Sequence, residues 1–566
     1  MKHSWRLFAL GLFLILAGAV AAHLVQTNGG IAIKDVRFTG ANGQTLSALL
    51  YIPPGVSSEA KAPAILAVHG YINSRETQSG FAIEFARRGY VVLALDQGGH
   101  GFSDPPAFAN GFGGPAALAY LRSLDIVDTA NIGLEGHSMG GWTVLAAAAS
   151  MPDAYRSVVL EGSSTGAPFA QEGSPTWPRN LAVVFSRYDE FSELMWGVSR
   201  AQDVAASAKL QAVFGTDAPV EPGRVYGDLA AGSARVLWTP NTTHPGDHLS
   251  TEAIGYAIDW FARTLDGGKA LPPADQIWPA KEAATLVALV GLVLLLAGSF
   301  DVLLKTRYFG RLAQVPATHA HGRRGWRWWL AFLASAAIPV ATYYPFFSWG
   351  AWLEASPWLP QTITTQIAVW AVLNGIILFL LGFVLRGERV VMTSRWLPAL
   401  LIALAVVGIG YLAVLAADFF LKVDFRFWIV ALKPMTAIQA RIALVYLVPF
   451  AIFFLLAHRA LHAGLTVAGD GRAAQYWSNI GALALGFLGL LVLQYATLLV
   501  AGHLLTPSEP LNTIVAMQFL PLMVVVGFLA TYTYRRTASY VPGALINALF
   551  VTWYIIAGQA TQYPLG

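Results

Sequence analysis

The pentapeptide Gly-His-Ser-Met-Gly at 136–140 places Ser138 where it could act as a nucleophile. It directly follows the short apolar run 132–135, and residues 142–149 have the composition of a helix. A serine on a sharp turn between a strand and a helix exposes its hydroxyl, and flanking glycines let neighbouring backbone pass without a Cβ clash. Because that hydroxyl is a poor nucleophile at neutral pH, it needs a nearby base and a carboxylate that orients the base.

Residues of the types that could be this base and this carboxylate follow other short apolar runs of the chain. Such runs have the length of β-strands, and side chains that follow them would lie at strand ends. The residues and the runs that precede them are His69 after 64–68, Asp96 after 91–95, Asp189 and Glu190 after 181–185, and His244 and His248 after 234–238.

The apolar runs predict the sheet that must position these residues. Residues 31–54 alternate apolar and polar side chains around Asn42-Gly43, which is a strong hairpin signal. The later runs, including 157–160, are mostly separated by helical patterns. Short apolar strands that alternate with helices predict a mostly parallel, doubly wound sheet with both faces covered. In such a sheet the reactive groups gather at the carboxyl ends of the strands.

Residues 31–266 resemble an α/β-hydrolase of the serine-esterase, dienelactone-hydrolase and serine-aminopeptidase-like kind. Three motifs occur in the family's order: His-Gly at 69–70, Asp-x-x-Gly-His-Gly-x-Ser at 96–103, and Gly-His-Ser-Met-Gly-Gly at 136–141. Gly98 departs from the pattern, because the family often has an arginine there. That arginine is generally structural, so we expect activity to survive its absence.

The resemblance implies a catalytic triad in the chain order serine, acid, histidine. Ser138 is then the nucleophile. Asp189 is the expected acid, with Glu190 as the alternative. His244 is the expected base, because it stands eight residues before Glu252, a spacing common in the family; His248 is the alternative.

Two backbone donors should stabilise the oxyanion of the reaction. The resemblance assigns them to the N–H of Met139, after the nucleophile, and the N–H of Tyr71, after the first long strand. The sequence His-x-x-x-His at 244–248 also suggests a metal site, but Pro245-Gly246 interrupts the helix that would align the two rings. We therefore expect neither a metal nor a cofactor.

The composition of the whole chain indicates a membrane protein. Of the 566 residues, 55% are hydrophobic and 12% are charged, whereas soluble domains carry roughly 25% charged residues. The net charge of +4 makes nucleic acid an unexpected partner. Cysteine is absent, which excludes disulfides and a cysteine nucleophile.

Apolar segments lie on both sides of the hydrolase-like region. Lys2 and Arg6 precede an apolar run at 7–22, which is typical of a cleaved signal peptide or an uncleaved signal anchor. We divide the chain into this segment at 1–23, the hydrolase domain at 31–266, a linker at 267–281 and an all-helical transmembrane domain at 282–566. The last holds eight candidate spans, at about 283–304, 328–349, 365–385, 396–417, 436–457, 479–503, 512–534 and 541–560.

The distribution of basic residues predicts how these spans are oriented. Cytoplasmic loops are rich in Lys and Arg. If the hydrolase domain lies outside the cytoplasm, thirteen basic residues of the span-connecting loops fall inside and four outside. The inner set is Lys305, Arg307, Arg311, Arg323, Arg324, Arg327, Arg386, Arg389, Arg395, Arg459, Arg472, Arg535 and Arg536; the outer set is Lys422, Arg426, Lys433 and Arg441. We expect a multi-pass plasma-membrane protein with its hydrolase domain on the extracytoplasmic side.

The resemblance implies a serine hydrolase that cleaves an ester through an acyl-enzyme. Membrane lipid and a small-molecule or lipid ester are the expected partners. Alternatives are an acyltransferase that uses a lipid-linked partner, a serine peptidase, and a transporter or sensor whose hydrolase fold only binds ligand. The identity of the substrate and the oligomeric state do not follow from the sequence.

Overall fold

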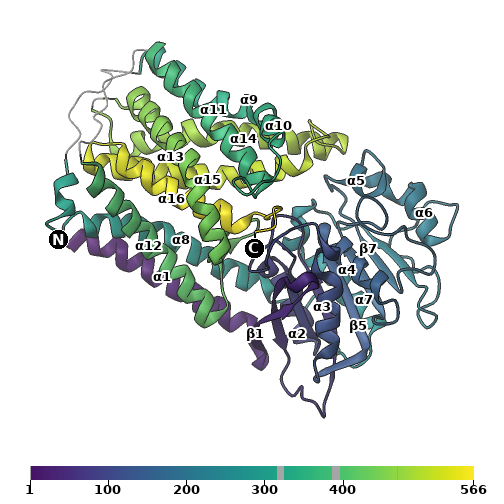
Figure 1. The fold of residues 1–566 in the computed structure, drawn as a ribbon. Helices are drawn as coiled ribbons and strands as arrows, with labels where there is room; N and C mark the ends of the chain where they lie inside the picture. Colours follow the sequence, from purple (N-terminus) through teal and green to yellow (C-terminus); the bar gives the residue numbers. More distant parts are fainter. Residues whose placement is uncertain (1, 315–323, 385–394, 468, 566) are drawn as a thin grey trace.

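The computed structural model describes residues 2–314, 324–384, 395–467 and 469–565. An α/β part lies at one end of the molecule and a long helical part at the other (Figure 1). The N-terminus lies at the far end of the helical part, and the C-terminus lies where the two parts meet.

The α/β part is built on an eight-stranded sheet in the order β1-β2-β4-β3-β5-β6-β7-β8. The strands β1 and β2 form the expected antiparallel hairpin, β2 pairs with β4 antiparallel, and all further pairs are parallel. The prediction of a mostly parallel sheet is therefore confirmed. The strands are β1 (Ala32–Thr39), β2 (Thr45–Ile52), β3 (Ala62–Val68), β4 (Val91–Asp96), β5 (Val127–His137), β6 (Ser157–Glu161), β7 (Leu181–Val184) and β8 (Arg235–Trp238).

Helices cover both faces of this sheet, which explains why strands such as β3, β4 and β7 are almost entirely apolar and buried. In β3, Leu66 and Val68 face one core, which also contains residues of α3 (Gly114–Ser123) and α4 (Met139–Ser150). Ile65 and Ala67 alternate with them and face the second core, which contains residues of α2 (Ser79–Arg87) and α7 (Thr251–Thr264). The two cores hold the carboxyl ends of the strands, and hence the loops after them, in fixed positions.

The helical part contains the long apolar helices expected from the sequence. Among the described residues, eight helices are long and apolar enough to cross a membrane, and α9 and α10 form a further pair bent by 44°. Seven of the eight expected C-terminal spans correspond to single helices, and the span expected at 328–349 is this bent pair. The helices are α1 (Lys2–Gln26), α8 (Trp278–Leu303), α9 (Trp326–Ala341), α10 (Tyr343–Ala351), α11 (Thr362–Val384), α12 (Trp396–Leu421), α13 (Ala437–Leu465), α14 (Arg472–Ala501), α15 (Pro510–Thr537) and α16 (Val541–Gly558).

The N-terminal helix α1 packs along α8 through glycines. A Cβ on Gly18 would lie 2.5 Å from the carbonyl oxygen of Ala284, and a Cβ on Gly11 would lie 2.5 Å from the backbone nitrogen of Leu295. Small residues of this kind let two helix backbones approach closely. The segment expected to be a signal peptide or an anchor is thus an integral part of the helical packing.

Candidate active site

Ser138 lies at the turn between β5 and α4, as the sequence predicts. Its φ of 54° and ψ of −122° are unusual for a residue with a side chain. The flanking glycines make this turn possible, because a Cβ on Gly136 would lie 2.2 Å from the carbonyl oxygen of Gly140. A Cβ on Gly140 would lie equally close to the carbonyl oxygen of Val68. The turn therefore presents the serine side chain at the carboxyl edge of the sheet.

His244 and Asp189, which are 55 residues apart in the chain, meet beside this serine. The Nδ1 atom of His244 donates to Oδ2 of Asp189 at 2.8 Å, and the N–H of Phe191 donates to the other carboxylate oxygen, also at 2.8 Å. Burial and the neighbouring Asp247 raise the pKa of Asp189, whereas the Phe191 N–H lowers it. Burial lowers the pKa of His244 to about 4, so its imidazole is neutral at neutral pH. Ser138 and His244 line the same cavity, whose volume is about 270 Å³.

The two alternative residues make other contacts. Glu190 accepts the backbone N–H of His244 at 2.8 Å and the hydroxyl of Tyr495 at 2.7 Å, so its carboxyl group holds the main chain of His244 rather than the imidazole. Burial, and then Asp189, raise the pKa of Glu190 to about 8. The Nε2 atom of His248 donates to the amide oxygen of Gln78 at 2.8 Å. The geometry favours Asp189 and His244 over these alternatives.

The backbone groups expected to stabilise an oxyanion face the same cavity. Tyr71 follows β3 and Met139 begins α4, and both line the space above Ser138. Within the described parts of the chain, neither N–H donates to another backbone or side-chain acceptor. Two such donors beside the nucleophile can stabilise negative charge on a carbonyl oxygen.

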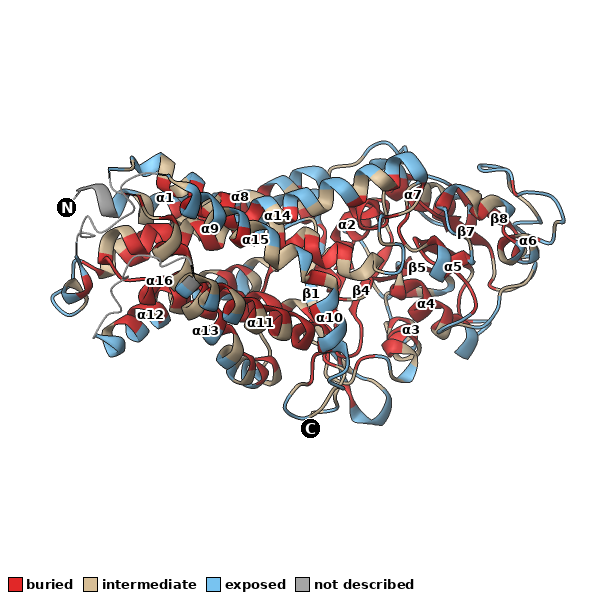
Figure 2. Ribbon diagram, turned by 90° about the horizontal axis from the view of Figure 1, so that it is seen from above, coloured by how far each residue is buried: buried red, intermediate tan, exposed pale blue. Residues whose placement is uncertain are grey.

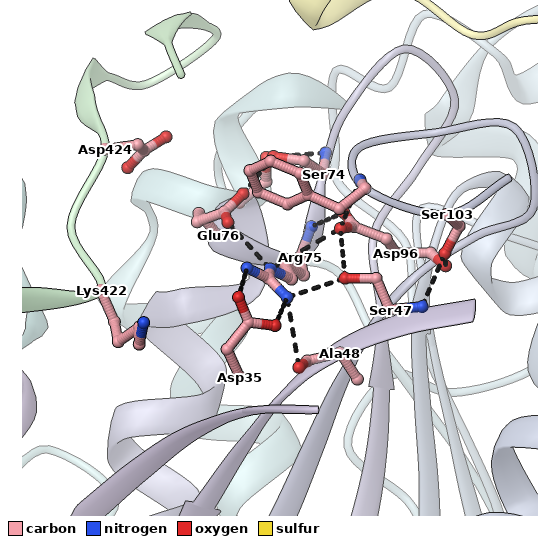
Figure 3. Close-up of polar contacts among 12 residues, drawn as sticks. Asp35, Ser47, Ala48, Ser74, Arg75, Glu76, Asp96, Ser103, Lys422 and Asp424 are labelled. Carbon is pink, nitrogen blue, oxygen red and sulfur yellow. Dashed lines mark hydrogen bonds and ion pairs between the residues drawn. The ribbon is translucent and has the colours of Figure 1, made fainter. Parts of the chain in front are cut away.

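A buried arginine fixes the loop that carries Tyr71 (Figure 3). Arg75 donates to both oxygens of Asp35 at 2.7 and 3.1 Å and to the hydroxyl of Ser47 at 2.7 Å, while its backbone N–H donates to Asp96 at 2.8 Å. These partners lie on β1, β2 and β4, so one residue connects the loop to three strands. Asp96, the last residue of β4 and the first of the motif at 96–103, therefore has a structural role.

The helical part supplies further contacts to the site loops. Arg426, on the short strand β9 (Phe425–Phe427), donates to the hydroxyl of Thr77 at 2.9 Å and to Asp424 at 2.8 Å. Gln562 donates to the hydroxyl of Tyr71 at 2.8 Å, and the indole N–H of Trp428 donates to the carbonyl of Pro245 at 2.5 Å. The sequence did not predict these contacts or that of Tyr495. No local pattern identifies a residue whose contact partner lies several hundred positions away in the chain.

A family model matches part of the α/β part. Residues 63–194 match the model described as "alpha/beta hydrolase fold". The chain contains an α/β-hydrolase domain. The matched segment includes Tyr71, Ser138 and Asp189 but ends before His244, and the helical part lies outside it.

Similar proteins match part of the chain. The quorum-quenching protein AidA of Acinetobacter baumannii is 34% identical over 131 residues, which are 20% of this chain and 39% of the relative. An uncharacterized protein of Mycobacterium tuberculosis is 32% identical over 106 residues, 17% of this chain and 28% of the relative. This chain thus covers well under half the length of these curated relatives. The esterase Pf2001 of Pyrococcus furiosus matches 43% of this chain and 96% of its own at 18% identity, with a TM-score of 0.30.

Proposed function

We propose that this protein is a membrane-bound serine hydrolase that cleaves a carboxylic ester through an acyl-enzyme, with Ser138, His244 and Asp189 as its triad. The observation that carries the proposal is that Ser138 and His244 line one cavity while Asp189 holds the far side of the imidazole. A serine lies on a strained turn, a neutral imidazole lines the same cavity, and a carboxylate receives the imidazole's Nδ1–H at 2.8 Å. This is the arrangement that serine hydrolases use on unrelated folds.

The proposed reaction moves one proton through His244. Its Nε2 atom takes the proton from Ser138 as the hydroxyl oxygen attacks the ester carbonyl, and the N–H groups of Tyr71 and Met139 stabilise the oxyanion. As the bond to the leaving alcohol breaks, His244 returns the proton to that alcohol, leaving an acyl-serine. Water then attacks the acyl-serine with His244 as the base, and His244 gives that proton to the oxygen of Ser138 as the acid is released. Asp189 keeps the Nδ1–H of His244 in place throughout.

Two features of the helix ends support a membrane location with the hydrolase domain outside the cytoplasm. Basic residues gather at the helix ends remote from this domain, at Arg307, Arg311, Arg324, Arg327, Arg395, Arg459, Arg472, Arg535 and Arg536. Three more of the thirteen basic residues predicted to face the cytoplasm, Arg323, Arg386 and Arg389, lie outside the described residues. Exposed tryptophans mark both ends, as in membrane proteins, at Trp326, Trp396 and Trp477 on the far side and Trp349, Trp352 and Trp358 near the hydrolase domain.

The packing of α1 supports an anchor that stays on the protein. The same arrangement places Lys2 and Arg6 with the other basic residues at the far end. We propose the domain limits given above, with residues 1–23 retained as the first span. Mass spectrometry of the purified protein tests this, because cleavage at the end of the apolar run at 7–22 would remove more than half of α1.

Turnover of a simple ester by the detergent-solubilised full chain tests the proposed activity. We expect the purified protein to hydrolyse p-nitrophenyl esters and the Ser138→Ala variant to lose this activity by about three orders of magnitude or more. A wild-type protein that folds but hydrolyses no ester would contradict the proposal and favour a ligand-binding role. If an added alcohol becomes acylated faster than water reacts, the enzyme is the acyltransferase alternative.

A further inference from the structure

The cavity above Ser138 has walls from both parts of the molecule. Phe108, Phe169 and Leu194 of the hydrolase domain line one side. The other side is formed by Leu511 and Ile514 of α15. Ile429, in the turn between β9 and β10 (Val430–Leu432), completes it. The hydrolase domain therefore does not enclose its own site.

The lining is predominantly apolar, with Asn73, Gln518 and histidines of the site among its few polar members. Phe108 and Phe169 stack with their ring centroids 5.9 Å apart, and Trp142 lies 5.2 Å from Phe169. Phe108, Phe169 and Leu194 are 39, 46 and 49% exposed, so the opening is apolar as well. A polar chain would lose its hydrogen bonds to water against such walls, whereas a hydrocarbon chain gains free energy there.

We infer that the substrate of the proposed hydrolase carries a hydrocarbon acyl chain, and that this chain lies between the rings of Phe108 and Phe169 and the helix α15. The inference rests on the proposed function, since it places the acyl group of the same ester. A water molecule occupies roughly 30 Å³ in the liquid, so a cavity of about 270 Å³ holds about nine atoms of similar size. An acyl chain of about eight carbons fits this space, and Ile514 limits its length.

The α15 wall is held rigidly enough to select chain length. The hydroxyl of Tyr554 on α16 donates to the side-chain oxygen of Gln518 at 2.7 Å, one turn beyond Ile514 on the same helix. Tyr495 on α14 connects the bundle to Glu190 in the loop that carries Asp189. Figure 2 shows the helical part lying against the hydrolase domain; much of α15 is buried, whereas α14 is mostly exposed or half-buried. A fixed wall rejects groups that would require it to move.

Chain-length profiles of two substitutions at one position test the inference. The purified full chain is assayed with p-nitrophenyl esters from acetyl to dodecanoyl, as wild type, Ile514→Trp and Ile514→Ala. We expect Ile514→Trp to lower the octanoyl-to-acetyl ratio of kcat/KM about 16-fold, because the indole fills space that about two methylenes would occupy, each worth about fourfold. Ile514→Ala should shift the optimum toward longer chains. The control is Val524→Trp, which adds the same group at a 40% exposed position of the same helix.

The outcomes separate this inference from the function on which it rests. If the wild type turns over the acetyl ester through Ser138 but both Ile514 profiles match those of Val524→Trp and wild type, the acyl-chain assignment is wrong while the hydrolase stands. If no ester is turned over, the proposed function fails and the inference with it. Presenting the octanoyl ester in solution and in phosphatidylcholine vesicles identifies the source of the substrate, since a bilayer substrate reacts faster in vesicles.

Discussion

Replacing Asp189 by asparagine should reduce ester hydrolysis far more than replacing Glu190 by glutamine. In the first variant the N–H of Phe191, which donates to one carboxylate oxygen at 2.8 Å, would keep the amide oxygen on its own side. The amide NH2 group would then face Nδ1 of His244, where the carboxylate now accepts at 2.8 Å. An NH2 group there requires Nδ1 to accept a hydrogen bond, so the proton moves to Nε2 and the imidazole no longer takes the proton of Ser138. Such a tautomer change costs about 10⁴-fold in kcat, or about 5.4 kcal/mol.

Glutamine at position 190 retains both contacts of the residue it replaces. Its amide oxygen can accept the backbone N–H of His244, and its NH2 group can donate to the hydroxyl of Tyr495, which both donates and accepts. The raised pKa of Glu190, about 8, means that its carboxyl group is already neutral at pH 7. We therefore expect a loss of no more than about tenfold, equivalent to one perturbed hydrogen bond.

The assay compares kcat of both variants with wild type on one p-nitrophenyl ester at pH 7, with thermal unfolding in detergent as the control for folding. A small loss in Asp189→Asn together with a large loss in folded Glu190→Gln would reverse the assignment of the acid. Equal, large losses would show that neither carboxyl group acts as the structure indicates.

Three further predictions follow from other contacts. Tyr495→Phe removes the donor to Glu190 and should lower kcat about tenfold with little change in KM, whereas Tyr308→Phe, at a 39% exposed position, should have no effect; a change in KM alone would contradict a positioning role. Because burial lowers the pKa of His244 to about 4 and the base must be neutral, kcat/KM should rise with pH through a midpoint near 4, and a midpoint at 6.5 would refute this. Gly18→Leu should destabilise the fold by about 1–3 kcal/mol, since even a Cβ at position 18 would lie 2.5 Å from the carbonyl oxygen of Ala284. If this variant and the wild type unfold at the same temperature, α1 does not pack against α8 in this way.

The sequence predicts most of the hydrolase fold because its signals are local. The strand runs, the Asn42-Gly43 hairpin and the turn at Ser138 each depend on neighbouring residues, and each occurs in the structure. The lengths of the long helices in the helical part likewise follow from runs of apolar residues in the sequence. The break between α9 and α10 was not predicted, nor was the small hairpin of β9 and β10, because both occur within or between segments of uniform apolar character.

The sequence does not reveal how the two parts share the site. Glu190 and Asp189 are adjacent and chemically equivalent, so only the geometry distinguishes the one that contacts the imidazole from the one that contacts the main chain of His244. Tyr495 and Ile514 lie in long apolar helices, where residues of these types are common. Their positions beside the catalytic loops depend on the packing of the whole bundle, for which a single sequence carries no local signal.

Mapping the residue that reacts with a fluorophosphonate probe tests the central claim most directly. The full chain is labelled in detergent, digested, and analysed by mass spectrometry, with Ser138→Ala as the control. We predict one adduct, on the peptide that contains Ser138, and none in the control. An adduct on another residue, or equal labelling of both proteins, would contradict the assignment of Ser138 as the nucleophile.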